Sequence, residues 1–134
     1  MSEAQNVENV KALYAAYARG DIAAVTDGLA PDVEWRQVSP VSFPTGGLKR
    51  GPQEVVEKFF ARVREVADVV AFNIDQILAS GETVVVLGHG RFRTKRTGEE
   101  WGVEFAHAMR MRDGRIAHFR EFTDTALLKE KSGW

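Results

Sequence analysis

The spacing of apolar residues predicts helices in the first half of the chain. Apolar side chains recur at helical intervals over about 6–19. Asp21 stands where it would cap a short second helix, and Pro31 is expected to end that helix. Gly51-Pro52 opens a third helix, because proline at the first helical position loses no intrahelical hydrogen bond. The second helix is expected to carry Ile22, Val25 and Leu29.

Further along, the pattern changes to that of strands. A short strand is expected over 33–38, followed by a loop over 39–50 that is rich in proline and glycine. Four longer strands are expected over 69–79, 83–93, 100–112 and 115–123, with 124–131 as a helical or irregular tail. This order predicts a single α+β domain over 1–134, in which a curved, mixed but mainly antiparallel sheet wraps three helices like a cone.

The dipeptide Asp113-Gly114 is typical of a two-residue hairpin turn, and this turn would fix the register of the last two strands. Met109 would then face His118, and His107 would face Arg120. Counting back through a turn near Thr97-Gly98 places Gly88 opposite His107. One face is then expected to hold Val84, Val86, Gly88, Gly90, Phe92, Phe105, His107, Met109, His118, Arg120, Phe122 and Asp124. The two glycines either bend the sheet or leave a hollow beside His107.

Four titratable residues interrupt this otherwise apolar inner face: His107, His118, Arg120 and Asp124. Such groups are costly in a core unless they are paired or reach a wet pocket, so the pattern predicts an internal cavity with polar groups. Two alternatives stay open. His118 lies near the hairpin end and would be exposed there, and Arg120 and Asp124 could pair with each other at the rim.

The opposite face of the predicted sheet is also apolar. It would carry Val85, Leu87, His89, Ala106, Ala108, Ala117 and Phe119, with Arg91 across from Glu104. Because the helices cover the other side, we expect a second copy of the chain to cover this face in a homodimer.

Composition removes several classes of function. The chain has no cysteine, which excludes thiol catalysis and zinc–thiolate sites. Its 18 basic and 19 acidic residues give a net charge of −1, unlike that of a dedicated nucleic-acid binder. No segment is apolar enough to predict a membrane span or a signal peptide, so the expected location is the cytoplasm.

Four segments carry a resemblance that runs in order along the chain. They are LYAAYARGDIAAVTDGLAPDVEW, FPTGGLKRGPQEVVEKFF, ILASGETVVVLGHGRF and MRMRDGRIAHFREFTDTALL. The sequence resembles the SnoaL-like group of the nuclear transport factor 2-like superfamily, which includes ketosteroid isomerases and polyketide cyclases. The resemblance implies the cone-shaped, cystatin-like fold described above. It leaves the activity open, because this scaffold hosts several enzyme classes and non-catalytic binders.

The resemblance also implies positions for catalytic residues. The catalytic base of the ketosteroid isomerases would fall on Gln37, which cannot abstract a proton from carbon, so that mechanism is not expected here. The tyrosine position would fall on Leu13, with Tyr14 and Tyr17 as neighbours, and the donor carboxylate near His107. The SnoaL-like cyclases use an acid/base group on the late strands, to which His107 and Asp124 could correspond.

Two main hypotheses for function follow. In the first, His107 is a general acid/base on a small hydrophobic carbonyl, polyketide-like or steroid-like compound. Arg120 would orient this compound or stabilise an oxyanion, and Asp124 would set the histidine tautomer or the local charge. No metal or other cofactor is expected. The ligand would contact Tyr14, Tyr17, Trp35, Gln37, Phe59, Gly88, Phe105, Met109 and Phe122. In the second, the same cavity binds a ligand without catalysis. A third reading is a dimerisation module.

Overall fold

The computed structural model describes residues 1–134 and arranges five α-helices, one π-helical turn and six strands around one core. The elements, in chain order, are α1 (Glu3–Ala18), α2 (Ile22–Asp27), β1 (Leu29–Gln37), β2 (Gly47–Arg50), α3 (Gly51–Val55), η1 (Val56–Phe60), α4 (Ala61–Val66), β3 (Ala67–Ser80), β4 (Thr83–Thr94), β5 (Glu100–Arg112), β6 (Arg115–Thr123) and α5 (Thr125–Ser132).

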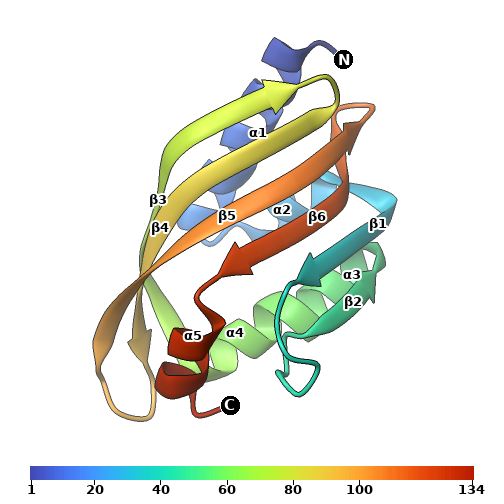
Figure 1. Cartoon of the computed structure of the whole chain (residues 1–134). Coiled ribbons are helices and arrows are strands. Elements are labelled where there is room, and N and C mark those ends of the chain that lie inside the picture. The colour runs from blue at the N-terminus through green and yellow to red at the C-terminus, as the bar shows by residue number, and fades with distance from the viewer.

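The six strands form one curved sheet in the order β2-β1-β6-β5-β4-β3. β1 and β6 run parallel, and every other neighbouring pair is antiparallel. The sheet does not close into a barrel, because β2 and β3 remain edge strands. It curls around α1, α2 and the α3–α4 helix, as Figure 1 shows. The predicted α+β fold, with a mixed but mainly antiparallel sheet, is confirmed.

The second helix is shorter than the sequence predicts. Asp21 caps α2 as expected, accepting a hydrogen bond from the Ala24 amide at 3.1 Å. The helix ends at Asp27, so Leu29 and Pro31 belong to β1, and the prediction that Pro31 ends the helix is wrong. The pairing of Leu29 with β6 explains the early strand, since tertiary pairing outweighs local helical spacing.

The predicted loop over 39–50 contains a strand. β2 pairs antiparallel with β1, and Trp35 lies opposite Lys49. β2 has only four residues, too few for any alternation of polar and apolar side chains to distinguish a strand from a loop. The rest of the predicted loop, 39–46, forms turns that bring Phe43 into a buried position.

The third helix begins at Gly51-Pro52 as predicted and continues through α3, η1 and α4. The π-helical turn in its middle widens the helix locally. Phe59 and Phe60 follow each other in this turn, and both side chains are buried. Each packs against Trp35, with ring centroids 5.5 Å away. The helix therefore contributes two consecutive aromatic rings to the core.

The register between β4 and β5 differs from the prediction by two residues. Gly88 lies opposite Phe105, and His107 lies opposite Val86. The turn spans four residues, 95–98, rather than two, which accounts for the shift. A shift of two keeps every side chain on its predicted face. A Cβ at Gly88 would lie 2.5 Å from Cζ of Phe105, so this glycine accommodates the Phe105 ring and leaves no hollow beside His107.

The register between β5 and β6 contains a β-bulge that the sequence analysis did not predict. Met111 faces Ile116 as expected, but the next pair is Arg110 with His118, so Ala117 is an extra residue on β6. Beyond the bulge, the face of every β6 side chain is reversed. The predictions that Arg120 and Phe122 face inward, and that Ala117 and Phe119 face outward, are therefore wrong: Ala117 and Phe119 are buried, whereas His118, Arg120 and Phe122 are exposed.

Candidate functional site

A cavity of about 130 Å³ lies between the helices and the inner face of the sheet. Most of its lining residues are apolar, and several are aromatic. Leu128, Ser132 and Trp134 line it from α5 and the chain end, beside α4 at the end of the molecule opposite the N-terminus (Figure 1). Of the predicted ligand-contact residues, it is lined by Tyr14, Tyr17, Trp35, Gln37, Phe59 and Phe105, together with the predicted acid/base His107.

Other predicted site residues lie elsewhere. Met109 is fully buried in the core but does not line the cavity. Gly88 borders a shallow groove on the outer face of the sheet, as does Phe122. Arg120 stacks its guanidinium over the Phe122 ring, 5.5 Å from the centroid, on that outer face. Asp124 caps α5 by accepting a hydrogen bond from the Leu127 amide at 3.0 Å. The expectation that Arg120 and Asp124 join His107 is wrong because of the bulge at Ala117.

The aromatic wall of the cavity is a stacked series. Phe72 stacks on Phe105 with centroids 4.7 Å apart, and Phe105 stacks on His107 at 4.2 Å. Tyr14 extends from α1 onto the same series, with its ring 5.8 Å from that of His107. These contacts hold the imidazole of His107 in one plane against the cavity wall.

Three titratable side chains meet at this wall. The Tyr14 hydroxyl contacts Nδ1 of His107, and Nε2 of His107 lies 2.8 Å from Oε2 of Glu121. The three residues come from α1, β5 and β6. The His107 side chain is 5% exposed and that of Glu121 is 16% exposed. The partner of His107 is thus Glu121, in place of the predicted Arg120 or Asp124.

The polar chain continues beyond Glu121. Nε2 of Gln37 donates a hydrogen bond to Oε1 of Glu121 at 2.9 Å, and the Thr45 hydroxyl donates to Oε1 of Gln37 at 2.6 Å. Gln37 and Thr45 are both buried. Because an ionised carboxylate only accepts hydrogen bonds, it faces the amide nitrogen of Gln37, and the amide oxygen is left to accept from Thr45. Both oxygens of Glu121 therefore accept hydrogen bonds.

These contacts determine the charge state of the site. Burial alone would raise the pKa of Glu121, but the hydrogen bond and charge of His107, with the Gln37 hydrogen bond, hold that pKa below its usual value. Burial, assisted by the nearby Glu121 carboxylate, raises the pKa of Tyr14 well above its ordinary value. The same two causes raise the pKa of Tyr17 to about 12. Glu121 is therefore ionised at neutral pH, and both phenols are protonated.

An ionised Glu121 fixes the hydrogen-bond roles of His107. Nε2 carries a hydrogen and donates it to the carboxylate, so in the neutral ring Nδ1 accepts the Tyr14 hydroxyl hydrogen. When the ring is protonated, Nδ1 donates to the Tyr14 oxygen, and the phenol hydrogen is free to point at a ligand. In both states each ring nitrogen of His107 has a partner, and Glu121 keeps its hydrogen bond from Nε2. The arrangement can thus take up or release a proton without an unpaired buried charge.

Sequence reasoning found Tyr14, Gln37 and His107 but missed Glu121 and Thr45. A regular hairpin from Asp113-Gly114 would place Glu121 on the outer face, so the register gave no reason to consider it. The only signal for the bulge is Ala117 beside Ile116, two apolar residues in succession where alternation would require one polar residue. Thr45 lies in a loop and has no sequence signal.

The structure contains no cluster of three histidine or carboxylate side chains suited to a metal ion, and no helix that is both long and apolar enough to cross a membrane.

Comparison with known proteins gives a consistent set of matches. The profile of the SnoaL-like domain family matches residues 10–119. A crystal structure of an NTF2-like protein of unknown function from Burkholderia pseudomallei is 31% identical, covers 100% of both chains and superposes with a TM-score of 0.88. An NTF2-like protein from Burkholderia thailandensis is 34% identical over 98% of both chains, with a TM-score of 0.85. TerC, co-crystallised with polyporic acid, is 29% identical over 97% of this chain and 99% of its own, with a TM-score of 0.88.

Proposed function

Because this chain belongs to the SnoaL-like domain family of the NTF2-like superfamily, we propose that its cavity binds a small, mainly apolar compound with a carbonyl, enol or phenol group. The observation that carries the proposal is the Tyr14–His107–Glu121 chain on one wall of an otherwise apolar cavity. Few, convergent polar groups in an apolar pocket are typical of a small-molecule site. The similarity to TerC, which was crystallised with a small molecule, supports ligand binding in this fold.

The volume of the cavity favours a small ligand. At about 130 Å³ it is close to an engineered apolar cavity of about 150 Å³ that holds benzene. A single-ring compound fits this volume, whereas a fused four-ring steroid is too large for it. We therefore place single-ring ketones, enols and phenols ahead of the larger steroid-like compounds.

We further propose that the site catalyses proton transfer without a bound cofactor. A proton leaving the carbon next to a substrate carbonyl would pass to the Tyr14 oxygen as the phenol proton moves to Nδ1 of His107. The Glu121 carboxylate would stabilise the resulting imidazolium through its hydrogen bond to Nε2. Return of the proton to a different atom of the substrate gives an isomerisation. Attack of the enolate on a second carbonyl, whose oxygen then takes the proton back from Tyr14, gives a cyclisation. Gln37 acts on Glu121 and is not a base.

The test measures hydrogen exchange in simple cyclic ketones. In D₂O, the wild-type protein should accelerate loss of the α-proton NMR signal, and His107→Ala should reduce that acceleration by about 10²–10⁴-fold with the fold intact. His89→Ala is the matched control, because His89 is exposed on the outer face and pairs with Asp75. Equal exchange rates in wild type and His107→Ala would refute the catalytic role.

The second candidate is a binder without catalysis. It is favoured by the complete internal satisfaction of the Tyr14–His107–Glu121 chain, which needs no reaction to explain it. In that case a phenol should quench the fluorescence of Trp35 on binding, His107→Ala should weaken the binding, and no variant or wild-type protein should exchange ketone protons. Unchanged binding in His107→Ala would place the ligand away from this wall.

We also propose a homodimer through the outer face of the sheet. On this face, neighbouring strands place Leu78, Val85 and Ala108 in one row. The next row contains Leu87, Ala106 and Phe122. Leu78, Leu87 and Phe122 are each more than a third exposed. Side chains of this size are usually covered when they are contiguous.

The cytoplasmic location expected from the sequence remains a prediction.

A further inference from the structure

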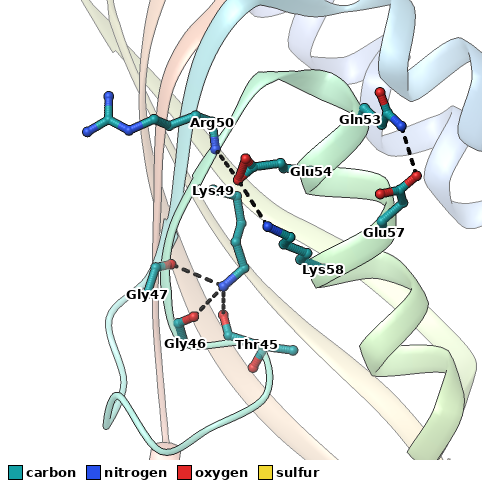
Figure 2. A network of polar contacts seen from close by, with 9 residues as sticks. All are labelled: Thr45, Gly46, Gly47, Lys49, Arg50, Gln53, Glu54, Glu57 and Lys58. Carbon is teal, nitrogen blue, oxygen red and sulfur yellow. Dashed lines mark hydrogen bonds and ion pairs between the residues drawn. The ribbon is translucent and has the colours of Figure 1, made fainter.

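Lys49 is a buried cation that the proposed reaction does not use. It lies opposite Trp35 across β1 and β2 and is 5% exposed. Its ammonium group donates to the carbonyl oxygens of Thr45 and Gly47, each at 3.3 Å, and to that of Gly46 (Figure 2). An ammonium group has three hydrogens, so all of its donors have acceptors within one loop.

The loop that Lys49 holds carries the start of the polar chain. Thr45 is fully buried and uses both of its polar ends. Its carbonyl oxygen accepts from Lys49, and its hydroxyl donates to Oε1 of Gln37. Gln37 in turn donates to Glu121. Unbroken polar contacts therefore link the Lys49 ammonium to the cavity, through one loop residue and one strand residue.

The Thr45 hydroxyl anchors the Gln37 side chain where its amide reaches Glu121. An ionised carboxylate only accepts hydrogen bonds, so it selects the NH₂ end of the amide, and the Thr45 hydroxyl, which can donate or accept, donates to the amide oxygen. With Thr45 on the oxygen, the NH₂ group faces the carboxylate and favours its ionised form. With the amide reversed, an oxygen would face the carboxylate and favour the protonated acid. A protonated Glu121 could no longer stabilise a His107 imidazolium.

We propose that Thr45 and Lys49 are positioning residues, which keep Glu121 ionised on His107 by holding the Gln37 amide against its carboxylate. The benefit of this positioning to the protein rests on the proposed acid/base function of the cavity. The ionisation of Glu121 itself is a property of the ligand-free protein and can be measured there. Gln37 then connects the loop that carries Thr45 to the Glu121 carboxylate, a role that its position alone does not reveal.

Few charged groups lie near Glu121 or near Lys49, the two ends of this chain of polar contacts. Around Glu121 they are His107, which contacts it, and the phenols Tyr14 and Tyr17, which are protonated. Around Lys49 they are Lys58 and Glu54 on the third helix, which pair with each other at 3.7 Å (Figure 2). Burial, followed by the Lys58 charge, lowers the pKa of Lys49, and Glu54 opposes this. Lys58 therefore offers a cation near Lys49 that touches none of the loop carbonyls.

The test follows the Glu121 carboxyl by ¹³C NMR during an acid titration of the protein without ligand. In Thr45→Val, which keeps the shape and removes the hydroxyl, the Glu121 titration should move upward by about one pH unit, because a hydrogen bond to the carboxylate is lost or reversed. Thr45→Ser retains a hydroxyl and should restore the wild-type titration. Lys49→Met should shift the titration in the same direction, whereas Lys58→Met, the matched control, should leave it unchanged.

The outcomes separate this inference from the proposed function. If Thr45→Val and Lys49→Met fold, as judged by circular dichroism, and Glu121 titrates as in the wild type, the positioning role is refuted. Should Thr45→Val fail to fold, the comparison of Lys49→Met with Lys58→Met decides, and equal titrations overturn the proposal. If the titration shifts as expected but wild-type protein neither binds nor exchanges cyclic ketones, the positioning role stands and the proposed function fails.

Discussion

At the scale of single residues, the buried carboxylate of Glu121 links the site to the stability of the fold. Its pKa in the folded protein is depressed, so the folded state binds the proton less readily than the unfolded state. The stability that Glu121 contributes is therefore fully present above the unfolded-state pKa of about 4.3. It is lost as the pH falls through the lower folded-state pKa.

This reasoning predicts the behaviour of Glu121→Gln. At pH 7 the variant should lose about 1.5–3 kcal/mol of unfolding free energy, the range for a hydrogen bond to a charged group. On acidification it should lose less further stability than the wild type, because it lacks the group that becomes protonated. Urea denaturation between pH 7 and pH 3 measures both effects. Parallel stability curves for the two proteins would contradict the assignment of a depressed pKa to Glu121.

Gly88 gives a second prediction at this scale. A Cβ on Gly88 would lie 2.4 Å from the Asn73 carbonyl oxygen and 2.5 Å from the Phe105 ring, both closer than real contacts allow. Gly88→Ala should therefore cost about 1–3 kcal/mol, as overpacking of a core does. Gly102→Ala is the control, because its Cβ would meet nothing closer than 3.6 Å. Thermal denaturation of the two variants gives the comparison, and equal melting temperatures would contradict it.

At the scale of elements, the bulge in β6 decides which residues form the site. Ala117 inserts one residue after Ile116, and from there on the strand presents Phe119 and Glu121 inward. If Ala117 instead paired with Arg110 in a regular hairpin, His118 and Arg120 would face the cavity, and their charges would have no partner among its aromatic residues. A single residue thus exchanges the inner and outer faces of most of the strand.

Deletion of Ala117 should preserve the fold, because it joins Ile116 directly to His118 in the regular hairpin that Asp113-Gly114 favours and leaves every later pair of β5 and β6 unchanged. Loss of the buried Ala117 side chain and of the local bend should cost about 1–3 kcal/mol, seen as a lower melting temperature in circular dichroism. Ala117→Gly, the control, keeps the bulge and should lose about 1 kcal/mol. An unfolded deletion variant would show that the bulge itself is required for folding.

The bulge also shows where sequence reasoning ends. Periodicity identified the order and type of the main elements, because each of them spans many residues of repeated pattern. The Asp113-Gly114 turn correctly paired Met111 with Ile116, but a turn fixes register only up to the first irregularity. His107 and Tyr14 could be placed near the cavity because they lie on regular elements. Glu121 and Thr45 could not, since one follows a bulge and the other lies in a loop.

At the scale of the whole molecule, the outer face of the sheet predicts the oligomeric state. The row of Leu87, Ala106 and Phe122 should be buried between two copies, so the wild-type protein should have the mass of a dimer in multi-angle light scattering at micromolar concentration. Leu87→Glu places an uncompensated charge in that contact and should yield monomers. Val41→Glu adds the same charge to a loop residue that is 93% exposed and should remain dimeric. A monomeric wild type would refute the dimer.

The parallel pairing of β1 with β6 affects how the protein folds during its synthesis on the ribosome. Trp35 lies beside Phe119, and Tyr14 contacts His107 across 93 positions of the chain. Such distant pairs close late, since the intervening chain must be synthesised first and its loop entropy overcome. Until β6 has been synthesised, the aromatic side chains of the N-terminal half, including Phe59 and Phe60, should remain exposed. Nascent chains that stall before β6 should therefore be clients of chaperones, and a ligand could bind only after the last strand has emerged.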